Sequence, residues 1–217
     1  MTGKKKKENA LFAVNALKEY YPESKCALKY EGDPFRLLVM AVLSAQCTDK
    51  RVNEVSVKLF ETLPDAKAFA DSEEGVLEEL IRPVGLFNSK AKNLRKACRM
   101  LVDRFGGKVP EEMDNLLSLP GIGRKVANLL RGDLYGKGGI VADTHCIRLS
   151  NRLGLADSKD PHKVEKQLSV LIPLEEQTDF CHRLVFFGRE ICRARSPLCI
   201  DCILRDKCQD HNKTEKK

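Results

Sequence analysis

The stretch that decides the fold is Leu119–Arg148, LPGIGRKVANLLRGDLYGKGGIVADTHCIR. Gly121 and Gly123 allow the backbone a positive φ and a close approach by another group. An apolar-periodic segment follows, so the turn precedes a helix whose first N–H groups are available to a phosphate. A plain turn is the alternative. The pattern predicts a hairpin that binds phosphate through Gly121, Ile122, Gly123 and Arg124.

Two residues of this stretch carry candidate chemistry. Lys125 would lie in the first helical turn, where the positive end of the helix dipole disfavours an ammonium. Such a lysine is a candidate nucleophile or Schiff-base former. Asp143 follows eighteen residues later and has the pattern of a helix N-cap. A solvated lysine and a simple cap are the alternative interpretations.

The composition indicates a globular protein of one or two domains. The 217 residues are 42% hydrophobic and 32% charged, and the longest apolar run, Leu37–Leu43, is too short for a bilayer. The lysine-rich start lacks the apolar segment of a signal peptide. We therefore expect a cytoplasmic protein with no membrane association.

The net charge of +7 is concentrated at the ends of the chain. Lys4–Lys7 and residues 212–217 carry most of it, and we expect both tails to be disordered. Within the body, Lys92, Arg95 and Arg99 share one face of a predicted helix with Lys96. This basic face favours a polyanionic partner, although a solvated helix face is an equal alternative.

Helical periodicity dominates the chain, and we expect an all-α fold. The helix over 34–45 is apolar nearly all round and should lie in the core. The predicted helices cover 10–20, 34–45, 49–62, 71–82, 88–105, 111–118, 124–135, 144–153, 161–171 and 175–187.

Four of the nine cysteines form a motif near the C-terminus. The other five are scattered and are interpreted as buried small side chains. The motif has the spacing C-x6-C-x2-C-x5-C, in a segment with little predicted secondary structure that a metal centre would stabilise. The spacing fits a zinc ion or an iron–sulfur cluster about equally. Its members are Cys192, Cys199, Cys202 and Cys208.

Several stretches together resemble one known family. LPGIGRKVAN, VADTH, LSAQCTD upstream and the cysteine spacing are similar to the endonuclease III group of helix–hairpin–helix DNA glycosylases. The resemblance implies two α-helical domains that bind DNA between them. A six-helix domain would cover 27–137, and a second would combine 1–26 with 138–217. It also implies that the four cysteines hold a [4Fe–4S] cluster.

The same resemblance implies a reaction and its residues. A monomer would act on double-stranded DNA that contains oxidised pyrimidines or abasic sites, as a DNA glycosylase and abasic-site lyase. Lys125 would attack the sugar, Asp143 would assist it, and the damaged nucleotide would be flipped out of the stack. Residues implied to contact DNA are Gln46 and Leu86 beside the flipped base, together with His145, Arg189, Arg193 and Arg195.

Two other functions are alternatives. A monofunctional glycosylase for mispaired adenine or thymine would lack Lys125, and a non-catalytic DNA-binding iron–sulfur protein would not need Lys125 and Asp143 together. The chain departs from the family pattern at 132–135 and 137–139. Gly132 is expected to loosen the helix that carries Lys125.

Overall fold

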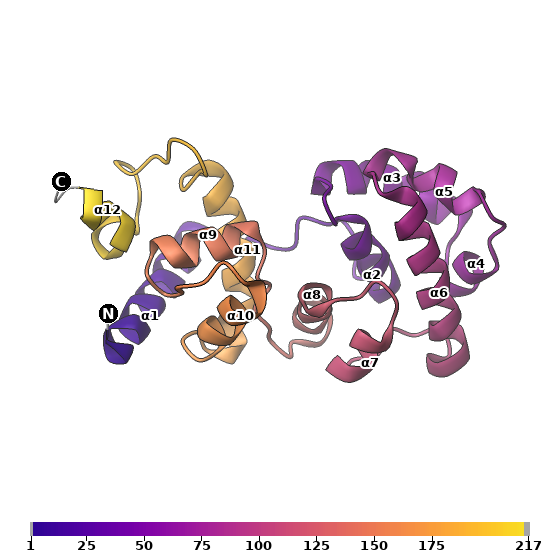
Figure 1. Ribbon diagram of the computed structural model, residues 1–217, viewed down its shortest axis with the longest axis horizontal. Helices are drawn as coiled ribbons and strands as arrows, with labels where there is room; N and C mark the ends of the chain where they lie inside the picture. Colours follow the sequence, from indigo (N-terminus) through magenta and orange to yellow (C-terminus); the bar gives the residue numbers. More distant parts are fainter. Residues whose placement is uncertain (1, 215–217) are drawn as a thin grey trace. The chain divides into compact units, whose positions relative to one another are not determined.

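The computed structural model describes residues 2–214, with side chains through residue 211. Over this range all regular structure is helical, which confirms the predicted all-α class. The chain forms two compact units, one of Cys26–Tyr135 and the other of the described residues on either side (Figure 1). The predicted domain limits of 27 and 137 lie one and two residues from the limits of these units.

Helix α2 forms the centre of the Cys26–Tyr135 unit. Asp33 caps it by accepting from the N–H of Phe35 at 2.8 Å, and Pro34 supplies a fixed φ at its first position. All its residues except Pro34 and Arg36 are buried, and it packs on α3, α6 and α8 (Figure 1). The helices of this unit are α2 Pro34–Leu43, α3 Asp49–Thr62, α4 Ala66–Asp71, α5 Val76–Ile81, η1 Arg82–Val84, α6 Phe87–Phe105, α7 Met113–Ser118 and α8 Arg124–Tyr135.

The helix predicted over 71–82 is confirmed only for Val76–Ile81, and its predicted start is wrong. Asp71 ends α4, and a new helix begins only at Val76. Gly75 between them has a φ of +94°, and its N–H donates to Glu78 Oε2 at 3.0 Å. The periodic pattern missed this break because the glycine and the carboxylate three residues later start a separate helix.

The basic face of α6 is partly neutralised. Arg95 donates to both carboxylate oxygens of Glu78, at 2.9 and 3.1 Å, and Arg99 bonds Asp71. The Arg95 hydrogen bonds hold the pKa of the Glu78 carboxyl below its usual value. These arginines therefore fasten α4 and α5 to α6, which weakens the case for this face as a polyanion site.

Helix α11 forms the centre of the other unit. It buries Phe180, Leu184 and Phe187, and it packs on α1 and α9. Arg183, only 3% exposed, is matched by Glu176 at 3.3 Å and Asp179 at 3.1 Å. The helices of this unit are α1 Gly3–Tyr20, α9 Thr144–Arg152, α10 Pro161–Ser169, η2 Leu174–Glu176, α11 Gln177–Glu190, η3 Arg205–Lys207 and α12 Gln209–Thr214.

The prediction of disordered tails is wrong for the described residues. Helix α1 begins at Gly3, so Lys4–Lys7 form its first turns, and α12 continues to Thr214. The segment 215–217 lies outside the described residues. Among the described residues, no helix is both long and apolar enough to span a membrane.

Gly138, one of the positions where the chain departs from the family pattern, is glycine for a structural reason. Gly138 has a φ of +65°, and a Cβ there would lie 2.6 Å from the backbone oxygen of Leu174. Gly136 has a similar φ of +61°, but a Cβ would meet nothing within 4 Å. A side chain at 138 would thus add a clash with backbone to the strain that both positions share.

We expect Gly138→Ala to lower the unfolding temperature more than Gly136→Ala. Both substitutions impose an αL strain of about 1–2 kcal/mol, and only the first displaces the Leu174 carbonyl. Thermal unfolding of both variants measures the difference. Equal unfolding temperatures would show that the close approach at 138 is unimportant.

Candidate active site and cysteine loop

The hairpin before α8 is held by the side chain between its two glycines. Ile122 is 5% exposed, and its N–H donates to the Leu119 carbonyl at 3.1 Å. The Ile122 amide thus closes the turn, and its side chain lies in the core. Its role is to anchor the hairpin. The expected phosphate contact at Ile122 stays a prediction.

Glycine occupies positions 121 and 123 for different structural reasons. Gly121 has a φ of +83°, and a Cβ there would lie 3.0 Å from Cβ of Asn93. Gly123 does not have a positive φ, and a Cβ there would meet nothing within 4 Å. The fold therefore requires glycine at 121, whereas the missing side chain at 123 leaves the backbone open to a close approach from outside.

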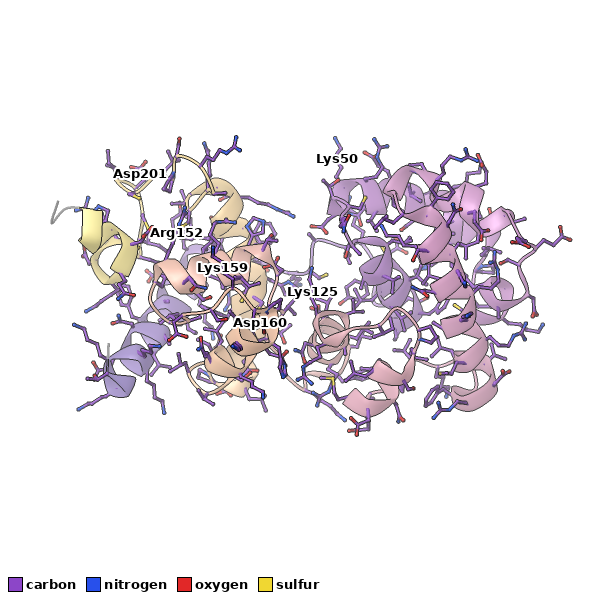
Figure 2. The ribbon with its side chains drawn as sticks, in the orientation of Figure 1. Lys50, Lys125, Arg152, Lys159, Asp160 and Asp201 are labelled. Atoms are coloured by element: carbon purple, nitrogen blue, oxygen red, sulfur yellow. The ribbon has the colours of Figure 1, made fainter. Side chains whose placement is uncertain are left out.

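Lys125 is exposed in the first turn of α8 (Figure 2). The opposite face of the helix buries Ala127, Asn128 and Leu130. At the other end the Tyr135 hydroxyl donates to the Val109 carbonyl at 2.7 Å. Packing on one face and this hydrogen bond hold α8 in place. The backbone that carries Lys125 is therefore well fixed despite the glycine at 132.

Asp143, in the other unit, is the N-cap of α9. Its Oδ1 accepts from the Cys146 N–H at 2.7 Å, and its own N–H donates to the Val141 carbonyl at 2.8 Å. The side chain is half-buried, and the cap leaves a second carboxylate oxygen. The carboxylate is therefore held in one orientation by the backbone around it.

His145 is held by an arginine that the sequence analysis missed. Nη2 of Arg148 lies 3.2 Å from Nδ1 of His145 and also donates to the carbonyls of Gly188 and Cys192, at 3.0 and 3.1 Å. A Cβ at Gly188 would lie 2.4 Å from that same Nδ1. A side chain at 188 would displace the histidine, a constraint that no local pattern indicates.

Gln46 and Leu86 are both exposed and both have unusual backbone. Their φ values are +55° and +48°, in the left-handed region that non-glycine residues rarely adopt. Leu86 is 57% exposed although it is a large apolar side chain. Strained backbone of this kind persists where the surrounding structure imposes it, and it gathers at functional sites.

The four cysteines of the motif line one cavity of about 210 Å³ in their unit. Each is half-buried, and none forms a disulfide. The cavity is several times the volume of about 30 Å³ that one water occupies. Among the described residues, no three of these four sulfurs lie within 4.8 Å of one another. One zinc ion with bonds of about 2.3 Å would bring them closer, so the geometry favours a larger group.

Arg152 of α9 fastens the loop that carries the cysteines (Figure 2). Its Nη1 lies 3.3 Å from Sγ of Cys192 and 2.7 Å from the Arg193 carbonyl, and its Nη2 donates to the Ala194 carbonyl at 3.1 Å. The sequence analysis missed this residue too. Its partners lie about forty positions along the chain, beyond the reach of a local pattern.

Two thiols of this loop, those of Cys202 and Cys208, are weaker acids than a free cysteine. Burial, followed by the charges of the neighbouring cysteines, raises the pKa of Cys202 to about 11. Burial also raises the pKa of Cys208. Four thiolates held together here need a positive partner, which is the chemistry of a metal centre.

The three arginines expected to contact DNA are all exposed. Arg189 lies in the last turn of α11, and Arg193 and Arg195 lie in the loop that follows. Nε of Arg193 donates to the Glu190 carbonyl at 3.1 Å, which orients the Arg193 guanidinium. The exposure and position of these side chains suit contacts with phosphate.

Comparison with known proteins gives matches over most of the chain. The model of the family described as HhH-GPD superfamily base excision DNA repair protein matches residues 39–174. The endonuclease III of Synechocystis sp. is 45% identical over 204 residues, which are 94% of this chain and 93% of that protein. A solved non-covalent endonuclease III–DNA complex is 39% identical, with a TM-score of 0.91 over 100% of both chains.

A second solved structure, a trapped endonuclease III–DNA covalent intermediate, is also 39% identical, with a TM-score of 0.91 over 99% of both chains. These findings confirm the family and enzyme class that the sequence predicted. The chain belongs to the endonuclease III group of the HhH-GPD superfamily of base excision DNA repair proteins.

Proposed function

We propose that this enzyme removes an oxidised pyrimidine from duplex DNA and then cleaves the strand, with Lys125 as its nucleophile. DNA glycosylase and abasic-site lyase is the activity of its family. The observation that carries the residue assignment is an exposed lysine in the first turn of a helix, directly after a glycine hairpin that is anchored from inside. A relative trapped in a covalent DNA intermediate is consistent with a nucleophile of this kind.

The first step replaces the base by the lysine. The uncharged Nζ of Lys125 attacks C1′ of the deoxyribose, and the bond from C1′ to the base breaks with its electron pair on the base, which takes up a proton. Nζ then loses a proton, and the C1′–O4′ bond opens with its electron pair on O4′, which takes up a proton. The product is an iminium linking C1′ and Nζ. A Schiff base of this kind is the usual product of a lysine amine with a sugar aldehyde carbon.

The second step cleaves the strand. The iminium acidifies the C2′ hydrogens, so loss of one C2′ proton expels the 3′ phosphate with the electron pair of the C3′–O bond. Water then hydrolyses the imine and releases Lys125. Asp143 would stabilise the positive charge that develops on the sugar and help to activate Lys125. Its cap hydrogen bond leaves the second carboxylate oxygen for this role.

The proposed DNA contacts are of two kinds, those to phosphates and those to the stacked bases. The Gly123 backbone and Arg124 would hold phosphate without reading sequence, as would Arg189, Arg193 and Arg195. Gln46 and Leu86 would fill the gap left by the flipped nucleotide, because inserted side chains offset the stacking that is lost. His145 would contribute a ring nitrogen to the backbone of the damaged strand.

The cysteine loop fits a [4Fe–4S] cluster. Four thiols line one cavity larger than a single ion needs, and an arginine already donates toward one sulfur. Cys192, Cys199, Cys202 and Cys208 would each bind one iron. When bound, the group supplies folding free energy to a loop that otherwise has little regular structure. The loop in turn presents Arg193 and Arg195.

Lys125→Ala tests the nucleophile. We expect base release from duplex DNA with one oxidised thymine to fall by at least about 10³-fold, and the adduct trapped by borohydride to disappear, while duplex affinity changes little. Lys58→Ala, an exposed lysine of α3, is the control and should behave as wild type. An adduct that persists in Lys125→Ala would refute the assignment.

Asp143→Asn separates the cap from the chemistry. Asparagine caps helices as well as aspartate does, so the unfolding temperature should not change, whereas turnover should fall by about 10²–10⁴-fold. Asp143→Ala should lose the same turnover and also about 1 kcal/mol of stability. Full turnover in Asp143→Asn would restrict this residue to its role as a cap.

Metal analysis tests the cluster. The purified protein should be brown and contain iron and acid-labile sulfide in equal amounts, and Cys202→Ser should lose both. Cys47→Ser lies outside the motif and should keep them. Stoichiometric zinc without sulfide would contradict the proposal.

A further inference from the structure

Lys90 is a buried lysine that the mechanism above does not use. It lies in the first turns of α6 and is 5% exposed. Both of its side-chain hydrogen bonds go to backbone carbonyls, at 2.8 Å to Leu43 and 3.0 Å to Val84. Burial lowers the pKa of this lysine. Burying a cation costs free energy unless the cation is hydrogen-bonded.

The two carbonyls are the ends of two different helices. Leu43 is the last residue of α2, and Val84 is the last residue of η1. The final carbonyls of a helix lack partners within it and carry its partial negative charge, so an ammonium suits them. One side chain therefore terminates both elements and sets the distance between their ends.

Each of these ends leads into one of the strained residues. Gln46 lies three positions after Leu43, and Leu86 lies two positions after Val84. The backbone N–H of Lys90 also donates to the Leu86 carbonyl at 3.0 Å. Lys90 thus contacts the segment of Leu86 twice and the segment of Gln46 once, and it belongs to the same rigid unit as both.

We infer that Lys90 is a positioning residue that fixes the spacing of Gln46 and Leu86, so that the two side chains enter the DNA stack together. This inference rests on the proposed role of those residues in filling the gap. Lys90 is not proposed to take part in the reaction itself. Its effect passes through the carbonyls of Leu43 and Val84.

The test uses the full-length protein with Lys90→Met, which keeps the length and bulk of the stem and removes the donors. Lys58→Met on α3 is the matched control, an exposed helical lysine of the same unit. One readout is the fluorescence of 2-aminopurine placed opposite a tetrahydrofuran abasic analogue, which rises when that base is unstacked. The other is the rate of base release from duplex DNA divided by the yield of borohydride adduct on a single-stranded abasic site.

We expect Lys90→Met to lose most of the fluorescence rise and to lower the duplex-to-single-strand ratio by about tenfold to a hundredfold, since small misplacements have effects of this size. The single-stranded adduct should persist, because no gap is filled there. An unchanged ratio and fluorescence in folded Lys90→Met would overturn the inference. Absence of an adduct in wild type would instead refute the proposed function.

Lys90→Arg decides the question should Lys90→Met fail to fold. It keeps a cation and N–H donors, but its planar group cannot place one atom between the two carbonyls. The duplex-to-single-strand ratio should therefore fall in this variant as well. A ratio equal to that of Lys58→Met would overturn the inference.

Discussion

The site depends on one constraint, the burial of Ile122 between two exposed glycines. Its side chain reaches the core, and its N–H closes the turn on Leu119. Because Ile122 points inward, the glycines on either side of it are exposed. At Gly121 the backbone has a φ of +83°, and a Cβ would lie 3.0 Å from Cβ of Asn93. Helix α8 begins at the next position after Gly123, so the same anchor places Lys125 in the solvent at a helix N-terminus. Core packing in this way determines where the proposed nucleophile lies.

Helix ends recur as the devices that position functional groups in both units. Asp143 caps the start of α9, and the ammonium of Lys90 terminates α2 and η1. In each case a side chain satisfies backbone groups that a helix leaves without partners. The cap holds the Asp143 carboxylate itself, and Lys90 holds the segments that lead to Gln46 and Leu86. The arginines of α9 serve the cysteine loop similarly, since Arg148 and Arg152 donate to its carbonyls. Stability and function therefore share the same hydrogen bonds.

The sequence correctly predicted the features that are determined by residues close together in the chain. The limits of α8 and the cap of α9 followed from a glycine turn and an aspartate, and the buried α2 followed from its uniform apolarity. The break at Gly75 was missed although its cause is local, whereas other features depended on partners distant in sequence. Arg95 was predicted to belong to a basic face for a polyanionic partner, because the sequence does not show that Glu78 folds against it. The burial of Lys90 could not be predicted either, because its acceptors are backbone carbonyls. No pattern in one sequence shows that Gly138 faces the Leu174 carbonyl.

The proposed mechanism centres on one atom, Nζ of Lys125. The most direct measurement is to reduce the enzyme–DNA complex with borohydride, digest the adduct with nuclease and trypsin, and locate the sugar by mass spectrometry. We expect the modification on the peptide Lys125–Arg131, with cleavage after Lys125 blocked because its amine is alkylated. A sugar on any other lysine or on the N-terminal amine would contradict it.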